Sequence, residues 1–354
     1  MTVLFEPFTL RGLTLKNRIV VSPMCQYSAG DDARATDWHF VHLGSRAVGG
    51  AALVMVEATS VESRGRLSLG DLGLYEDAQI EPLARIARFV HAQGAAFAIQ
   101  LAHGGRKAWS GASFRPEGVT RGFGPEPIVS AGSAPFDEGW AVPHALDVSE
   151  IAGIVRAFRA SAERALTAGF DVIELHGAHG YLLHGFLSPL ENRRTDSYGG
   201  SLENRARLFV EVARAVREVW PAERPLLARL SCTDWLDGGF TPDDAVAVSR
   251  ILAAEGVVAI DCSSGGVAPH APIPVGPGYQ VFLAEKIRSE TGIPTIAVGM
   301  LTSARQCAEI VARGQADLVA LAREELRDPY FPLRAARELG VDVAWPAAYA
   351  RAKP

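Results

Sequence analysis

The feature that most constrains the fold of this chain is a repeated alternation of short apolar runs with longer helical patterns. The apolar runs are rich in Val, Ile and Leu and contain few of the alternating polar residues found in half-exposed strands. They cover residues 19–22, 52–57, 96–100, 172–176, 226–230, 258–262, 295–298 and 318–321. Continuous apolar runs of this length are typical of parallel strands that are buried on both faces.

Helical patterns separate these runs, and several of them end at a glycine that directly precedes the next run. They cover residues 81–93, 149–168, 202–220, 241–255, 280–291 and 303–313. Ser149 is a candidate N-cap, and Gly169 and Gly292 are candidate C-terminal caps. The repetition indicates βα units, and eight of them predict an α/β fold, a closed (β/α)8 TIM barrel. An open doubly wound sheet is the alternative, but no GxGxxG motif follows the first strand.

The length of 354 residues would favour two domains at about 150 residues each. A barrel with insertions also accounts for the whole chain, so we expect a single TIM-barrel domain over residues 1–354. Three segments lie outside the βα units: an N-terminal hairpin at 4–15, a Gly-, Pro- and Ser-rich insertion at about 102–147, and a tail at 340–354. We expect the hairpin to close the bottom of the barrel and the insertion to overhang the C-terminal strand ends, where barrel active sites lie.

Composition excludes several classes of protein. Lys and Arg number 35 against 40 Asp and Glu, and this net charge of −5 disfavours a nucleic-acid partner. The apolar stretches are far shorter than the ~20 residues of a membrane-spanning helix, and residues 1–18 lack a signal-peptide core. A cytoplasmic location without a membrane partner is therefore expected. The four cysteines form no CxxC pair, so we expect no zinc ribbon and no iron–sulfur cluster.

Glycines and polar residues gather where the last three predicted strands end. Ser264, Gly265 and Gly266 follow the sixth strand, Gly299 follows the seventh, and Arg323 follows the eighth. Glycine lets a backbone approach a ligand closely, and Arg binds phosphate through paired hydrogen bonds. This arrangement predicts a phosphate site. The alternative is that the glycines form only tight turns and that Arg323 caps a neighbouring element.

The sharpest candidate for chemistry is His176-x-x-His179-x-Tyr181, which follows the fourth strand. Two imidazoles and a phenol can hydrogen-bond one carbonyl oxygen and supply a proton nearby. A structural role is one alternative. A metal-dependent barrel hydrolase, with His103 and Asp261 as further ligands, is another.

Three more polar residues stand on or beside predicted core strands. Cys25 is either a small buried side chain or a thiol that tunes a cofactor. Gln100 and Arg229 need partners because they are expected to be buried. They suit the edge of a heterocycle that becomes anionic on reduction; otherwise Arg229 would pair with a carboxylate such as Glu174.

Four motifs together carry a family resemblance: PMCQY at 23–27, QLAHGGRK at 100–107, HGAHGYL at 176–182 and NRRTDSYGGS at 192–201. They resemble the old yellow enzyme family of FMN-dependent ene-reductases over residues 4–351. The pair Cys25 and Tyr27 is similar to that of its thermophilic-like, xenobiotic-reductase branch. The resemblance implies FMN bound non-covalently at the C-terminal mouth of the barrel. The implied FMN contacts are Pro23, Met24, Cys25, Ala58, Gln100 and Arg229 around the ring, and Ser264, Gly265, Gly266, Gly299, Ala322 and Arg323 around the phosphate.

The resemblance also implies an activity, that of an NADPH dehydrogenase or ene-reductase. NADPH or NADH reduces FMN and leaves, and a hydride then passes to the C=C bond of an α,β-unsaturated carbonyl or nitro compound. His176 and His179 bind the carbonyl oxygen, and Tyr181 donates the proton. Cys25 modulates the flavin and Tyr27 contacts the substrate. A flavin-binding protein without catalysis is the alternative.

Three features bear on the details of this resemblance. Ala322 stands where glycine is expected, and its methyl would crowd the phosphate if the backbone needed a positive φ. The insertion is long for this branch, and it is either a loosely packed loop or a lid over the substrate entrance. The tail resembles one in which an arginine, here Arg351, reaches the site of a neighbouring subunit. A homodimer or a dimer-based tetramer is therefore expected.

Overall fold

The computed structural model describes residues 2–114 and 117–353. Eight parallel strands form a closed barrel, and the ladder between its last and first strands pairs Ala320 with Val20. In order around the barrel, the strands are β3 (Ile19–Val21), β4 (Leu53–Ser60), β5 (Ala96–Ala102), β8 (Val172–Gly177), β9 (Leu226–Ser231), β10 (Ala259–Ser263), β11 (Thr295–Ala297) and β12 (Leu318–Leu321). The predicted (β/α)8 barrel is confirmed.

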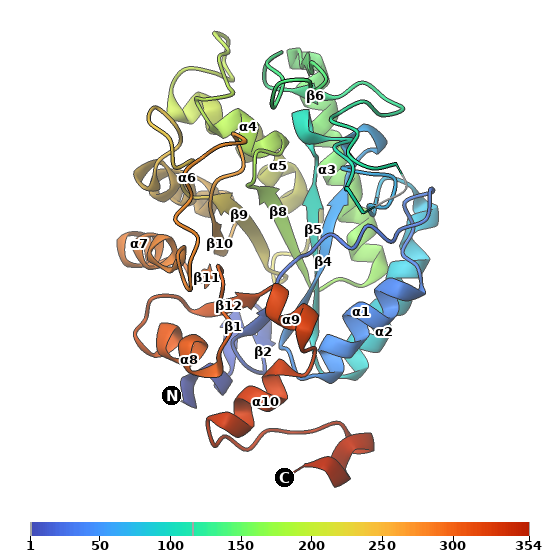
Figure 1. Ribbon diagram of the computed structural model, residues 1–354, viewed down its shortest axis with the longest axis vertical. Helices are drawn as coiled ribbons and strands as arrows, with labels where there is room; N and C mark the ends of the chain where they lie inside the picture. Colours follow the sequence, from blue (N-terminus) through green and yellow to red (C-terminus); the bar gives the residue numbers. More distant parts are fainter. Residues whose placement is uncertain (1, 115–116, 354) are drawn as a thin grey trace.

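Helices cover the outside of the barrel (Figure 1). They are α1 (Asp37–Val48), α2 (Ile80–Ala92), α3 (Val148–Ala168), α4 (Leu182–Leu187), α5 (Leu202–Val219), α6 (Pro242–Ala254), α7 (Val281–Thr291), α8 (Ala304–Ala312), α9 (Arg323–Arg327) and α10 (Phe331–Glu338). Their apolar faces pack on the strands in one large core, where Phe158 of α3 and Leu252 of α6 are fully buried. Burying such a side chain contributes about 2 kcal/mol. Gly169 and Gly292 end α3 and α7 in left-handed conformations, as predicted.

A short hairpin closes the N-terminal end of the barrel. Strands β1 (Phe8–Leu10) and β2 (Leu13–Leu15) pair antiparallel, and Arg11 turns the chain with a φ of 51°. Leu10 and Leu15 belong to a second apolar cluster that includes residues from the lower ends of the barrel strands. The hairpin predicted at 4–15 therefore plugs the bottom, which leaves the C-terminal end as the face that can receive a ligand.

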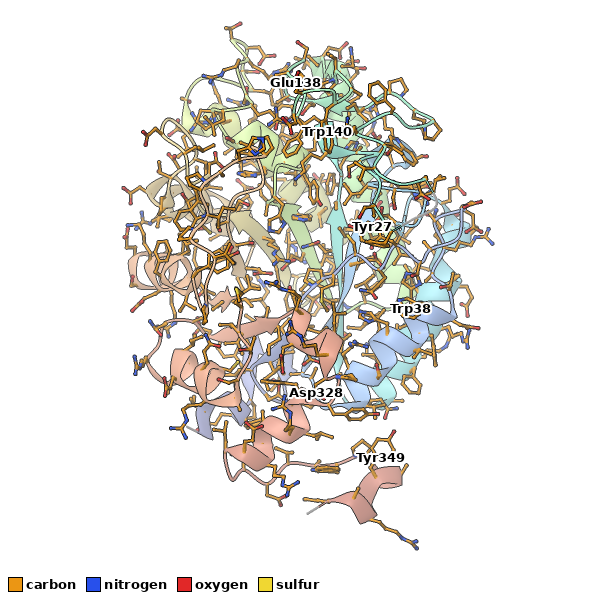
Figure 2. The ribbon with its side chains drawn as sticks, in the orientation of Figure 1. Tyr27, Trp38, Glu138, Trp140, Asp328 and Tyr349 are labelled. Carbon is orange, nitrogen blue, oxygen red and sulfur yellow. The ribbon has the colours of Figure 1, made fainter. Side chains whose placement is uncertain are left out.

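The insertion lies above the C-terminal ends of the strands (Figure 1). Its short strands β6 (Val129–Ser130) and β7 (His144–Ala145) pair with each other, and Trp109 packs against Ile128 in a small core of its own. Figure 2 shows Glu138 and Trp140 of this insertion at the same end of the molecule. Residues 115–116 of the predicted insertion, and residue 354 of the predicted tail, lie outside the described residues.

The tail lies at the opposite end, where Figure 2 labels Tyr349. It ends in a 3₁₀ helix, η5 (Ala347–Ala352), in which no residue is buried. Together with nearby loops the tail borders a cavity of about 720 Å³, whose wall carries Lys16 and no other titratable side chain. The wall of this cavity therefore lacks the set of acidic, basic and nucleophilic side chains that catalysis needs. Separately, no helix among the described residues has both the length and the apolar character required to cross a membrane.

Candidate active site at the barrel mouth

A row of polar side chains crosses four neighbouring strands inside the barrel. The strand register sets Gln100 of β5 beside Glu174 of β8, and Arg229 of β9 beside Asp261 of β10. Gln100 Nε2 donates to Glu174 Oε1 at 2.7 Å, and Arg229 Nε lies 3.2 Å from Asp261 Oδ2. The carboxylate paired with Arg229 is therefore that of Asp261 and not that of Glu174, the alternative partner considered from the sequence.

Burial governs the charge of this row. It raises the pKa of Glu174 to about 8, with Asp261 adding to the effect and Arg229 and Gln100 opposing it. It also raises the pKa of Asp261, against the pull of Arg229. Glu174 is therefore mostly protonated near pH 7.

The Arg229 guanidinium borders a cavity that a bound cofactor could occupy. Its Nε is paired with Asp261, and its side chain forms part of the cavity wall. A guanidinium has further N–H donors, which suit a ligand with acceptors on its edge. The pyrimidine edge of FMN carries such acceptors, and Gln100 lies two strands away with both a donor and an acceptor. The residues present therefore fit the ring of FMN.

The cavity next to Arg229 has a volume of about 200 Å³ and lies at the ends of β10, β11 and β12. Gly299, Ala322 and Arg323 line it, as expected for a phosphate site. Gly299 has a φ of 124°, and a Cβ there would lie 3.0 Å from Gln280 Nε2, so glycine is required. Ala322 has a φ of −108°, so its methyl group is not strained and the sequence-based concern does not apply.

The other residues predicted for the phosphate site follow β10. Gly265 and Gly266 have φ values of 70° and 91°, and Ser264 Oγ donates to Gln280 Oε1 at 2.6 Å. Tyr279, Gln280 and Met300 also line the cavity, although no sequence motif marked them. They are brought there by the loops after β10 and β11, and only Met300 lies next to a glycine predicted for this site, Gly299.

The three residues of the predicted catalytic cluster lie close together. The ring of His176, near the end of β8, lies 4.9 Å from the Tyr181 ring and 5.1 Å from the His179 ring, between centroids and edge to face. The connecting loop is tightly turned, because His179 and Gly180 have φ values of 61° and 73°. A Cβ at Gly180 would lie 2.2 Å from the carbonyl oxygen of Gly266, so only glycine fits.

The same burial keeps all three rings of this cluster uncharged. Burial, followed by the charge of Arg229, lowers the pKa of both His176 and His179 well below 6.5. Burial raises the pKa of Tyr181 above 10. His176 Nδ1 accepts a hydrogen bond from the Ala178 N–H at 3.3 Å, which leaves the proton of the neutral ring on Nε2. The cluster therefore offers an imidazole N–H and a phenol O–H as donors.

His179 is fixed from several directions. Its Nε2 lies 2.7 Å from Ser263 Oγ, and its backbone N–H donates to Ser231 Oγ at 2.9 Å. Lys107 Nζ donates to the carbonyl oxygens of His179 and Gly266, at 2.9 and 3.1 Å. These bonds join the loop that carries His179 to the loop that carries Gly266.

The segment after β3 places Cys25 next to two buried carboxyl groups. Glu57 Oε2 accepts from the Gln26 N–H at 2.7 Å, and Glu57 Oε1 lies 3.0 Å from His39 Nε2, which anchors the segment. Burial, then the charges of Asp71 and Glu57, raises the pKa of Cys25. Cys25 forms no disulfide, and because its pKa is raised it is a neutral thiol near pH 7.

The four residues considered as ligands for a hydrolytic metal ion are instead held by other partners. His103 Nε2 lies 2.8 Å from Glu62 Oε1, and Asp261 pairs with Arg229. Within the described ranges, the group with metal-ligand spacing is Cys25, Glu57 and Asp71, and none of the four belongs to it. The geometry therefore does not favour the hydrolase alternative.

Arg351 is the one predicted site residue that the structure does not bring to the mouth. It is exposed in η5, at the end of the molecule opposite the C-terminal strand ends (Figure 1). Tyr27 has a φ of 53°, and its ring packs edge to face on Phe114 of the insertion at 5.1 Å. Met24 is half-buried beside the core, and Ala58 is buried at an irregularity in β4.

Comparison with known proteins identifies relatives over nearly the full length. Residues 3–341 match the family described as NADH:flavin oxidoreductase / NADH oxidase. The chain is 48% identical over 351 residues to an NADPH dehydrogenase of Geobacillus thermodenitrificans (strain NG80-2), covering 99% of this chain and 98% of the relative. An NADPH dehydrogenase of Bacillus licheniformis is 48% identical over 350 residues, with the same coverage of 99% and 98%.

Comparison with solved structures also identifies reductases. Morphinone reductase matches with a TM-score of 0.78 at 29% identity, over 97% of this chain and 91% of that chain. A 2-naphthoyl-CoA reductase complex matches with a TM-score of 0.86 at 25% identity, over 95% of this chain but 52% of that longer chain. The chain belongs to the NADH:flavin oxidoreductase / NADH oxidase family, the family of old yellow enzyme, and is an FMN-dependent NAD(P)H oxidoreductase.

Proposed function

We propose that this enzyme is an ene-reductase that reduces the C=C bond of α,β-unsaturated carbonyl compounds, and of nitro-activated alkenes. The observation that carries the proposal is the cluster of His176, His179 and Tyr181, three uncharged side chains whose rings meet beside Arg229. Neutral donors around one point suit a substrate oxygen that gains negative charge during the reaction.

FMN, when bound, supplies hydride transfer between NAD(P)H and the substrate. Gln100 and Arg229 are the residues that would hold the edge of its ring, and Arg229 would supply positive charge there. Gly299 and Arg323, with the loop at 264–266, would hold its phosphate. Cys25, with Pro23, Met24 and Ala58, would line the ring from the β3 and β4 side.

The chain's own donors perform the other half of the chemistry. His176 Nε2–H and the ring of His179 hydrogen-bond the carbonyl oxygen, which draws electron density away from Cβ. Tyr181 holds its proton at pH 7 and delivers it to Cα. Because these rings are buried, each hydrogen bond to the developing negative charge is stronger than it would be in water, by a few kcal/mol.

The insertion supplies a wall of the substrate entrance. Lys107 Nζ, itself part of the insertion, lies 4.6 Å from the centroid of the Phe136 ring and 5.3 Å from that of Tyr181, so the insertion reaches the cluster of His176, His179 and Tyr181. On the other side, Phe114 packs on Tyr27. Both contacts support a role for the insertion as a lid, with Tyr27 as a substrate contact beneath it.

The proposed assembly is a homodimer or a dimer-based tetramer in which Arg351 enters the site of a neighbouring subunit. The exposed tail supports this, as do Trp38 and Val41, two apolar residues of α1 that are 57% and 66% exposed. The partners proposed are a small-molecule enone and a second copy of the chain, and the use of NAD(P)H suits a cytoplasmic location.

The test is anaerobic reduction followed by turnover. NADPH should bleach the flavin absorbance of the purified holoenzyme, and 2-cyclohexenone should restore it, with cyclohexanone as the product by gas chromatography. A flavin that NADPH does not bleach would indicate the non-catalytic alternative. Bleaching that 2-cyclohexenone and nitroalkenes fail to reverse, or 2-cyclohexenol as the product, would contradict C=C reduction.

A further inference from the structure

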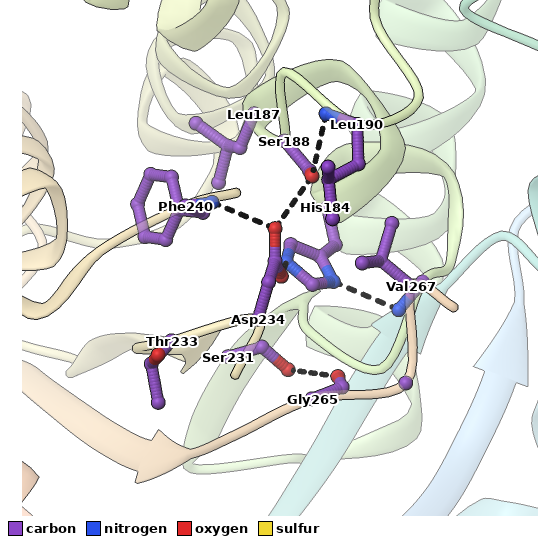
Figure 3. Close-up of polar contacts among 12 residues, drawn as sticks. His184, Leu187, Ser188, Leu190, Ser231, Thr233, Asp234, Phe240, Gly265 and Val267 are labelled. Carbon is purple, nitrogen blue, oxygen red and sulfur yellow. Dashed lines mark hydrogen bonds and ion pairs between the residues drawn. The ribbon is translucent and has the colours of Figure 1, made fainter. Parts of the chain in front are cut away.

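The loop after β8 that carries His179, Gly180 and Tyr181 is called the catalytic loop here. Directly beneath it lies a pair of ionisable side chains that the proposed chemistry does not use. His184 in α4 and Asp234 in the segment after β9 both have side chains that are 0% exposed, and His184 Nε2 lies 3.0 Å from Asp234 Oδ1. Figure 3 shows the pair together with its surrounding polar contacts. A buried ionisable pair is costly to desolvate, so its presence calls for a reason.

The hydrogen bonds around the pair fix where its proton lies. His184 Nδ1 accepts a hydrogen bond from the Gly180 N–H at 2.8 Å, so the proton of the neutral ring is on Nε2 and faces Asp234. Asp234 Oδ2 accepts two further hydrogen bonds, from Ser188 Oγ–H at 2.6 Å and from the Phe240 N–H at 2.7 Å. Burial alone would raise the pKa of Asp234, but His184 and these donors outweigh it and keep the pKa low.

The residue held by this pair is the centre of the catalytic loop. Gly180 lies between His179 and Tyr181, and both Gly180 and His179 have left-handed backbones. That conformation is unfavourable for a histidine, so it persists only where the surroundings impose it. The Gly180 N–H bonds to His184 and the His179 N–H bonds to Ser231, which imposes the turn from two sides.

We propose that Asp234 and His184 form a positioning pair, which holds Gly180 and thereby sets the side chains of His179 and Tyr181 for substrate binding. Asp234 selects the tautomer of His184 that leaves Nδ1 free to accept the Gly180 N–H. The pair acts through the backbone of the loop and does not touch the substrate. Its effect on substrate rests on the proposed function, whereas its effect on the loop does not.

The Asp234→Asn variant tests the tautomer without changing the volume of the side chain. In this variant the amide oxygen accepts the hydrogen bonds from Ser188 Oγ–H and the Phe240 N–H, because the amide nitrogen cannot accept them. The amide NH₂ therefore faces His184 Nε2. That NH₂ donates to Nε2 and forces the ring proton onto Nδ1, where it opposes the Gly180 N–H. A carboxylate-to-amide change that misplaces a histidine proton in this way disables a site while preserving its packing.

Ser188→Ala is the matched control, because it removes a hydrogen bond from the same carboxylate but leaves the His184 proton on Nε2. We expect Asp234→Asn to weaken binding of p-hydroxybenzaldehyde to the holoenzyme about tenfold, with loss of the long-wavelength charge-transfer band. Ser188→Ala should change that affinity by less than about threefold. Selective ¹⁵N-histidine spectra should show the ring proton of His184 on Nε2 in the wild type and on Nδ1 in Asp234→Asn.

Equal affinities in Asp234→Asn and Ser188→Ala, or a proton that stays on Nε2 of His184, would overturn the proposal. If Asp234→Asn does not fold, the variants His184→Asn and His184→Leu replace it. The Asn side-chain oxygen can still accept the Gly180 N–H, whereas Leu cannot, so His184→Asn should bind p-hydroxybenzaldehyde more tightly than His184→Leu. Similar affinities for those two would also overturn it. If the wild-type holoenzyme does not bind the phenol, the proposed function fails, while the ¹⁵N spectra and hydrogen exchange at Gly180 still decide the role of the pair.

Discussion

Burial shifts the pKa values of His176, His179 and Tyr181 more strongly than any single neighbour does. It leaves His176 and His179 neutral and keeps the proton on Tyr181. The motif alone identified these three residues, because polar residues directly after an apolar strand stand out in a sequence. Asp261 as the partner of Arg229 could not be identified in this way, since that pairing depends on strand register and on which face each side chain occupies.

Tyr181→Phe separates the two halves of the reaction. The variant keeps the ring but loses the proton, so reduction of the flavin by NADPH should stay within about twofold of the wild-type rate. Reoxidation by 2-cyclohexenone should slow by about 10² or less, because solvent can replace the proton donor. Stopped-flow measurement of each half-reaction checks this. An equal loss in both half-reactions would show that Tyr181 acts on the cofactor or on the fold instead.

At the scale of elements, the strands and the longer helices were predictable because their apolar patterns are uninterrupted. The run at 318–321 coincides with β12, whereas β4 extends to Ser60, beyond the apolar run that ended at residue 57. Two of the three extra residues, Thr59 and Ser60, are polar, and all three are buried. Polar side chains at a strand end therefore conceal how far the strand continues.

Two local features differ from the sequence-based expectation. Helix α1 was not predicted, because its buried face carries His39, His42 and Arg46 and thus breaks the apolar period. The N-cap of α3 is Asp147 and not Ser149: Asp147 Oδ1 accepts from the Glu150 N–H at 2.8 Å, in a capping box. A carboxylate at this position also favours the positive end of the helix dipole, which Ser149 cannot match.

The insertion offers a prediction about substrate binding. Phe136→Ala removes the ring that covers Lys107 beside Tyr181, so the entrance should open and hold small enones less firmly. The KM for 2-cyclohexenone should rise about fivefold, which corresponds to about 1 kcal/mol of lost contact, while flavin reduction by NADPH is unchanged. Phe123→Ala is the control, because this residue lies in the same insertion and is 67% exposed. If both variants raise KM alike, the insertion acts as a whole and not through Phe136.

For the whole molecule, His42 makes stability depend on pH. Burial, then the charges of Arg46 and His39, lowers the pKa of His42 to about 3. An unfolded chain has a histidine pKa of about 6.5. Below that pH the unfolded chain binds a proton that the native protein excludes, so stability that is complete above pH 6.5 is lost progressively as the pH falls toward 3.

The variant that isolates this effect is His42→Gln. The decrease in the free energy of unfolding between pH 7.5 and pH 5 should be about 2 kcal/mol smaller in His42→Gln than in the wild type. This difference corresponds to one proton taken up by the unfolded chain over the roughly 1.5 pH units between its histidine pKa and pH 5. Reversible urea unfolding of the holoenzyme at both pH values gives the comparison. His270→Gln changes an exposed histidine and should leave the difference unaltered. A His42→Gln protein with the wild-type pH dependence would show that His42 is protonated in the folded state.

The position of the tail requires that Arg351 act on another subunit, if it acts at a site at all, because it lies at the far end of its own barrel. Complementation distinguishes the two cases. In a heterodimer of an Arg351→Ala chain and a Tyr181→Phe chain, purified through two different tags, the Arg351→Ala subunit keeps its own Tyr181 and receives the intact arginine of its partner. One of the two sites is then complete, so ene-reduction should recover to about half of the wild-type rate, above both parent homodimers. If Arg351 served its own chain, neither site would be complete and the heterodimer would show only the average of its parents. A monomer in sedimentation analysis would contradict the shared site directly, since no partner could then supply the arginine.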